Sequence, residues 1–156
     1  MKPCIHLEII HLKGKLKCDA VLTELGDYAI SRKWARMGYC QALIQREQDF
    51  PTGLQTKTIG VAIPHADPHW VKEPAVIAGI LPEIVNFHNM ENSRSTVPVQ
   101  LVLLLSLPSE IGHMELLRAL VNMISDDSFL KRFIAKPSKD RLLEFLRPIC
   151  VDLEFQ

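Results

Sequence analysis

The 156-residue sequence has no long hydrophobic run and no excess of charge of either sign. Its longest apolar stretch, residues 99–107, is interrupted by Gln100 and Ser106 and is far shorter than the roughly 18 to 20 residues that a membrane-spanning helix needs. The 18 basic and 18 acidic residues cancel, so no long-range field draws the chain to nucleic acid or anionic lipid. The first fifteen residues contain no apolar signal-peptide core. We therefore expect a cytoplasmic protein that binds neither nucleic acid nor, directly, a membrane.

Cysteine is also scarce. The chain has four, and they are too widely spaced for a metal clip and too few for a disulfide framework: Cys4, Cys18, Cys40 and Cys150. Reduced, partly buried thiols are the simplest interpretation. No motif indicates a cofactor, and we expect none.

The chain shows no repeat and no low-complexity linker, which predicts one domain over residues 1–156. Apolar runs predict strands, and a helical apolar period predicts helices. The expected strands cover residues 6–12, 58–63, 75–81 and 99–107, and the expected helices cover residues 19–37, 39–50 and 114–124, with two shorter helices capped by Asp126 or Asp127 and by Ser138. This order predicts an α/β sandwich, in which a central mixed sheet is flanked by helices on both faces.

The most informative segment is residues 60–65, where an apolar strand ends in Pro64 and presents His65 at a chain reversal. Pro64 fixes its own φ and favours an extended Ile63, so the imidazole should leave the strand in a set direction. A neutral imidazole can attack phosphorus through one ring nitrogen while the other keeps its proton. A histidine that only satisfies a buried carbonyl group is the alternative.

Arg46 shares the expected stripe of the second helix with Leu43 and Phe50. We therefore expect its guanidinium to point toward the domain and to need an anion. The planar guanidinium matches the oxygens of a transferred phosphoryl group. A structural ion pair with Glu47 or Asp49 is the alternative.

His113 follows Pro108 and Gly112 at an expected helix start, where backbone donors and the helix dipole favour an anion. A neutral histidine there can donate a hydrogen bond to a phosphate oxygen, although a solvated histidine would also fit. His65, Arg46 and His113 thus agree on one kind of ligand, a phosphoryl group.

The residues between Trp34 and His65 carry a resemblance to a known family. They contain the runs Ala42-Leu43-Ile44, Arg46-Glu47, Phe50-Pro51-Thr52-Gly53 and Ala62-Ile63-Pro64-His65. With these runs, the chain resembles, over nearly its whole length, the enzyme IIA domains of the bacterial sugar phosphotransferase system, mannitol/fructose type. The match is closest to the galactitol-type branch, where the same ALI-x-RE-x-x-FPTG run precedes the histidine. His113 and the leucines after it resemble the family's H-L-x-x-L signature.

The resemblance implies a phosphoryl carrier. His65 would accept phosphate from phospho-HPr and pass it to a cysteine of the matching IIB subunit during sugar uptake, so the membrane would be reached only through IIB and IIC. By motif, Arg46 matches the family's active-site arginine and His113 matches its second histidine. Because the phosphoryl group must be shared between two proteins, we expect an open surface around His65, with Trp70 and Val71 as candidate docking residues.

Two departures from the family pattern bear on this expectation. Ala66 replaces the glycine that usually follows the active histidine, and it fits the turn only if its φ stays negative. The spacing from Arg46 to His65 is longer than expected for mannitol-type members, which favours the galactitol-like branch. That branch often lacks the second histidine.

Two other functions stay open. His65, Asp67 and His69 form an H-x-D-x-H pattern that could hold zinc or another divalent ion in a hydrolase, although Pro68 disturbs regular extended backbone. A regulatory IIA of the nitrogen-related branch would keep the phosphohistidine and act by binding other proteins. The FPTG match favours sugar transport.

Overall fold

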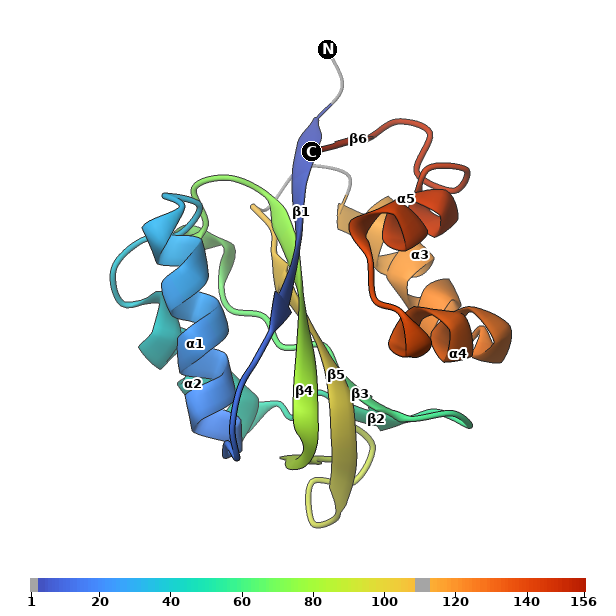
Figure 1. Cartoon of the computed structure of the whole chain (residues 1–156). Coiled ribbons are helices and arrows are strands. Elements are labelled where there is room, and N and C mark those ends of the chain that lie inside the picture. The colour runs from blue at the N-terminus through green and yellow to red at the C-terminus, as the bar shows by residue number, and fades with distance from the viewer. Residues whose placement is uncertain (1–2, 109–112) are drawn as a thin grey trace.

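A six-stranded mixed sheet forms the centre of the computed structural model, which describes residues 3–108 and 113–156 (Figure 1). Its strand order is β2-β3-β5-β4-β1-β6. The strands are β1 (Cys4–His11), β2 (Gly53–Gln55), β3 (Gly60–Ala62), β4 (Ala75–His88), β5 (Thr96–Ser106) and β6 (Glu154–Phe155). β1 runs parallel to β4 and β6, and β3 runs parallel to β5, whereas β2–β3 and β4–β5 are antiparallel pairs.

Helices cover both faces of this sheet (Figure 1). One face carries α1 (Cys18–Ser31) and α2 (Tyr39–Asp49), and the other carries α3 (His113–Ile124), α4 (Asp127–Ala135) and α5 (Lys139–Leu146). The predicted α/β sandwich is therefore confirmed. Within residues 3–108 and 113–156, no helix combines the length and the hydrophobicity that crossing a bilayer requires.

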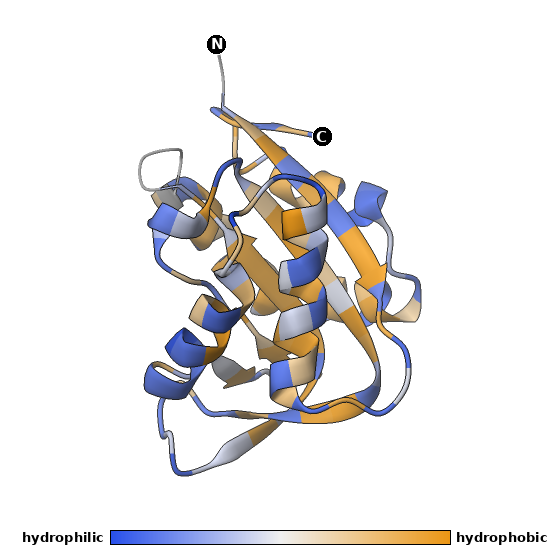
Figure 2. Ribbon diagram, turned by 90° about the vertical axis from the view of Figure 1, so that its left-hand side faces the viewer, coloured by the Kyte–Doolittle hydropathy of each residue, from blue (hydrophilic) through white to orange (hydrophobic). Residues whose placement is uncertain are grey.

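The central strand β5 supplies side chains to both hydrophobic cores. Leu101, Leu103 and Leu105 belong to the core under α3, α4 and α5, whereas Val102 and Leu104 belong to the core under α1 and α2. The alternation follows from the two-residue period of a strand. Figure 2 shows the hydrophobic strands between helices whose outer faces are hydrophilic. Each such side chain, fully buried, stabilises the fold by about 1.5–3 kcal/mol.

α1 ends earlier than the sequence pattern predicts. The helix stops at Ser31 instead of residue 37, because Lys33 adopts a left-handed conformation with φ 64° and its N–H donates to the Ile30 carbonyl. A lysine in this position is an uncommon helix stop, since glycine is the usual residue there. Asp19 makes no cap, and Lys17 occupies the N-cap position.

Gly38, the residue after the predicted end of the first helix, is the N-cap of α2 and has φ 97°. A Cβ atom at this position would lie 2.6 Å from the Trp70 ring, so the site requires glycine for both conformation and space. The Arg36 N–H also donates to the Trp70 carbonyl at 2.9 Å, and Ala35 forms a β-bridge with Val71. The segment before α2 therefore supports the loop that follows β3.

Val71 is buried and Trp70 is half-buried in this packing. The expectation that Val71 offers an exposed docking surface is wrong, because its bridge to Ala35 turns it into the fold.

β4 is longer than the predicted strand 75–81 and continues to His88. Phe87, which lies beyond the predicted strand, is fully buried and pairs with Val97. The short strands β2 and β6 were not expected, because their two or three residues are too few to show a period.

The buried face of α3 is only part of the apolar stripe that the sequence predicts, which comprises Met114, Leu117, Val121 and Ile124, widened by Leu116 and Leu120. Leu116, Leu120 and Ile124 are buried as expected, together with Met123, whereas Met114 and Val121 are exposed. The helix has a wide apolar arc, and periodicity alone does not identify which part of that arc meets the sheet.

The predicted caps of the last two helices are confirmed. Asp126 accepts a hydrogen bond from the Phe129 N–H at 2.9 Å, and Ser138 accepts one from the Arg141 N–H at 3.2 Å.

Replacing Asp126 by alanine should lower the free energy of unfolding by about 1 kcal/mol, because the first turn of α4 loses its side-chain acceptor. Asp126→Asn keeps an acceptor and is the matched control. Urea denaturation of the three proteins measures the difference. Equal stability of the alanine and asparagine variants would contradict the role of the cap.

Candidate functional site

His65 lies just beyond the carboxyl end of β3, next to β5. The Leu105 N–H donates to the carbonyl of the buried Pro64 at 3.0 Å, and His65 forms a β-bridge with Leu105. Pro64 cannot donate a ladder hydrogen bond, so regular pairing ends here and the imidazole leaves the sheet at a fixed point. His65 is half-buried, so the residue is partly accessible to solvent.

One ring nitrogen of His65 is held by the backbone. Its Nδ1 lies 3.1 Å from the Ile63 carbonyl oxygen. A carbonyl oxygen only accepts hydrogen bonds, so Nδ1 carries the proton. In the neutral ring, Nε2 then holds the free lone pair and is the nitrogen that could act as a nucleophile.

His65 and Arg46 line the same pocket, of about 310 Å³. The other lining residues come from the loop after His65, from the end of β5 and from α3: Ala66, Asp67, Pro68, Leu105, Leu107 and Leu117. Among the described residues of this lining, the arginine is the single cationic side chain. The pocket thus places a nucleophilic nitrogen and a guanidinium around one apolar-walled space.

Arg46 does not point into the domain as expected. Its side chain is exposed, because the buried face of α2 runs through Tyr39, Leu43 and Glu47 and leaves Arg46 at the edge. The guanidinium carbon lies 4.4 Å from the centre of the Phe50 ring, in cation–π contact. Within the described part of the chain, Arg46 forms no salt bridge, so the alternative pairing with a carboxylate of its own helix is absent.

Glu47 is a buried carboxylate that no sequence motif indicated as functional. Its two oxygens accept hydrogen bonds from Thr52, one from the backbone N–H at 2.7 Å and one from the hydroxyl at 2.8 Å. Burial raises the pKa of Glu47, and the Thr52 hydrogen bonds and then His88 partly offset this shift. Its spacing of four residues from Leu43 places it on the buried face of α2, and this spacing could have predicted its burial.

Residues 5–148 match the family described as "Phosphoenolpyruvate-dependent sugar phosphotransferase system, EIIA 2". The chain belongs to this family. It is an EIIA type 2 chain, a phosphotransferase-system component, as the motif resemblance predicted.

Individual relatives agree with this assignment. The galactitol-specific EIIA component of Escherichia coli strain K12 is 27% identical over 132 residues, which cover 85% of this chain and 87% of that protein. The mannitol enzyme IIA in the Escherichia coli complex with phosphorylated mannitol enzyme IIB has a TM-score of 0.69 at 22% identity, covering 90% and 94% of the two chains. The nitrogen regulatory protein IIA-Ntr from Neisseria meningitidis has a TM-score of 0.71 at 23% identity, covering 89% and 92%. Both structures share the fold of this EIIA chain.

Ala66 fits the turn after His65 without strain. Among the described non-glycine residues, Lys33 alone has a positive φ, so the φ of Ala66 is negative. The condition for replacing the usual glycine is therefore met in this EIIA chain.

His113 is the first residue of α3, at the predicted helix start. Its side chain lies outside the described residues. Its position is four residues before Leu117, which lines the pocket with His65 and Arg46.

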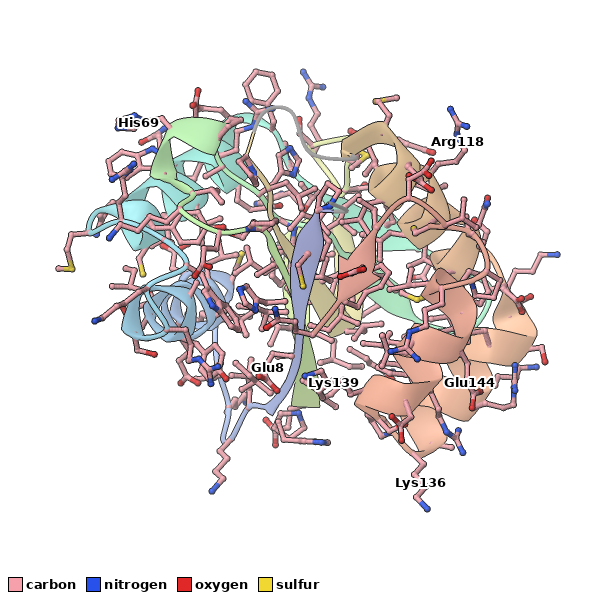
Figure 3. All side chains as sticks on the ribbon, turned by 90° about the horizontal axis from the view of Figure 1, so that it is seen from above. Glu8, His69, Arg118, Lys136, Lys139 and Glu144 are labelled. Carbon is pink, nitrogen blue, oxygen red and sulfur yellow. The ribbon has the colours of Figure 1, made fainter. Side chains whose placement is uncertain are left out.

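The geometry does not favour a metal site at His65, Asp67 and His69. Asp67 accepts a hydrogen bond from the His69 N–H at 2.9 Å and thereby caps the 3₁₀ turn Pro68–Trp70. Figure 3 shows His69 at the periphery of the molecule. Across residues 3–108 and 113–156, no cluster of three or more histidine, cysteine or acidic side chains could hold a metal ion.

Three of the four thiols of the EIIA chain should react slowly with alkylating reagents. Burial, together with nearby acidic residues, raises the pKa of Cys18 to about 12, that of Cys40 to about 12 and that of Cys150 to about 11. A raised pKa leaves these thiols protonated at pH 8, and only the thiolate is nucleophilic. We expect iodoacetamide to modify the three at least about ten-fold more slowly in the native protein than in urea, as measured by peptide mass spectrometry. Alkylation of any of them at the unfolded-chain rate would contradict this prediction.

Proposed function

We propose that this EIIA chain, acting as one domain over residues 1–156, carries a phosphoryl group on Nε2 of His65. The lone pair of Nε2 attacks the phosphorus of phospho-HPr, a nitrogen–phosphorus bond forms on His65, and the bond to the donor breaks, returning the electron pair to HPr. A cysteine thiolate of the IIB subunit then attacks the same phosphorus, and His65 recovers its lone pair.

The observation that carries this proposal is the hydrogen bond from Nδ1 of His65 to the Ile63 carbonyl. It selects the tautomer that leaves Nε2 free, and it holds the ring in one orientation. The same bond stabilises positive charge that develops on the imidazole as Nε2 forms its new bond, because Nδ1 keeps its proton and its acceptor.

Arg46 has the role of neutralising charge on the phosphoryl oxygens. Its guanidinium lines the pocket of His65, and Phe50 supports it through cation–π contact. Positioning and charge neutralisation account for most of phosphoryl-transfer catalysis. His113, matched by motif, is the second histidine that would donate a hydrogen bond to the same group.

The proposed physiological role is the uptake of a sugar alcohol, with galactitol as the first candidate. The galactitol-specific relative supports this, since its alignment spans most of both chains. The likeness to IIA-Ntr concerns the fold, and it does not favour a regulatory role over transport. The partners are then phospho-HPr and a IIB subunit, and the cytoplasmic location expected from the sequence stays a prediction.

Phosphorylation of His65 can be tested by incubating the protein with phosphoenolpyruvate, enzyme I and HPr. We expect an acid-labile phosphoprotein whose label maps to His65, and no label in His65→Ala, because Nε2 is the attacking atom. His69→Ala, whose ring lies outside the pocket, is the matched control and should be labelled like the wild type. Undiminished labelling of His65→Ala would refute the site. Transfer of the label to a galactitol-type IIB would identify the acceptor.

Arg46→Ala should fold normally and accept the phosphoryl group about 100- to 1000-fold more slowly, since a preorganised donor to the transferred oxygens is lost. Arg46→Lys should recover part of the rate, because it restores charge without the planar fork. Rapid-quench measurement of label transfer gives the rates. Arg118→Ala removes an exposed arginine of α3 that lies outside the pocket lining and is the control (Figure 3). A normal rate in Arg46→Ala would show that the arginine has no part in transfer.

A further inference from the structure

We propose that Glu47 is a positioning residue for the phosphoryl site, an inference that rests on the function proposed for His65 and Arg46. Its buried carboxylate closes the turn after α2 and thereby sets the orientation of the His65 ring and the separation of that ring from Arg46. Glu47 lies outside the pocket lining and acts through Thr52.

The contacts of Glu47 are those of a clamp. Both carboxylate oxygens bind Thr52, which is itself buried, so the carboxylate fixes the backbone and the side chain of one residue together. The titratable groups near Glu47 on other elements are Cys18 of α1, whose pKa it helps to raise, and His88 of β4. None of these groups forms a salt bridge with it within the described residues. Its hydrogen-bonding capacity is therefore directed to the turn.

A chain of hydrogen bonds runs from this clamp to the imidazole. The Thr52 carbonyl accepts from the Ile63 N–H at 3.4 Å, and the Ile63 carbonyl accepts from Nδ1 of His65 at 3.1 Å. The next residue, Gly53, pairs with Ala62 in the β2–β3 ladder. Displacement of Thr52 therefore displaces the peptide that holds the His65 ring.

The other end of the turn leads to the guanidinium. The Phe50 N–H donates to the Arg46 carbonyl at 2.7 Å at the end of α2, and the Phe50 ring is in cation–π contact with the Arg46 guanidinium. The two groups of the pocket are thus attached to opposite ends of one short turn, residues 50–52 between α2 and β2, that a single carboxylate closes. A small error in such a separation is costly, because a displacement of about 1 Å can lower a transfer rate about 100-fold.

The test compares Glu47→Ala and Glu47→Gln, with Asp49→Ala as the control for an exposed carboxylate on the same helix. Long-range ¹H–¹⁵N spectra of the His65 ring report which nitrogen is protonated, and the phosphoryl-acceptance rate is measured in the same samples. We expect Glu47→Ala to populate both tautomers and to accept phosphate about 10- to 100-fold more slowly. Glu47→Gln keeps an acceptor for Thr52 and should restore both readouts, and Asp49→Ala should change neither.

Two outcomes would overturn the proposal: a wild-type ring spectrum and rate in Glu47→Ala, or a loss of rate explained by the unfolded fraction while the spectrum of the folded molecules stays unchanged. If Glu47→Ala does not fold, Thr52→Val removes one half of the clamp and Thr52→Ser retains it. The valine variant should be slower and show the altered ring, and the serine variant should not. Absence of label in the wild type would refute the proposed function alone, because the ring spectra still decide the role of Glu47.

Discussion

The hydrogen bond between Nδ1 of His65 and the Ile63 carbonyl is the constraint on which the site depends. A free imidazole rotates and exchanges its proton between its two nitrogens, so neither nitrogen is fixed as the one with the free lone pair. In this chain the carbonyl of Ile63, two residues before His65, fixes the proton on Nδ1. The buried Pro64 ends the regular strand just before His65. The end of the strand therefore sets the position of His65 and leaves Nε2 as the nitrogen with the free lone pair.

The pocket draws its walls from three layers of the fold. Arg46 comes from the layer of α1 and α2, His65 follows a strand of the sheet, and Leu117 comes from the layer of α3, α4 and α5. Each of the two helical layers is held to the sheet by its own hydrophobic core, since β5 sends alternate side chains to opposite faces. The positions of the pocket residues therefore depend on both hydrophobic cores, although few buried side chains line the pocket itself.

The sandwich, the strand that leads to His65 and the helix that carries Arg46 were all predictable, because long apolar runs and Pro64 are strong local signals. Other features depended on tertiary packing. Arg46 lies at the edge of the buried face of α2, and no periodicity distinguishes an edge from a centre. Lys33 ends α1 in a conformation that its side chain does not favour, and the buried face of α3 is chosen by contact with the sheet. The buried position of Glu47 was not predicted, because charged residues are expected on the surface.

The contact between Gly38 and Trp70 has a consequence for exchanging parts among relatives of this chain. The loop after His65 rests on the segment before α2, although the two are well separated in sequence, through the Trp70 ring, the Arg36 N–H and the bridge at Ala35. In a transplanted loop, a residue smaller than tryptophan at position 70 would leave Gly38 without its packing partner. A side chain of another shape there would clash with the backbone at Gly38. Any chimera that imports one of these segments must import its partner, so the smallest transferable unit is discontinuous along the polypeptide.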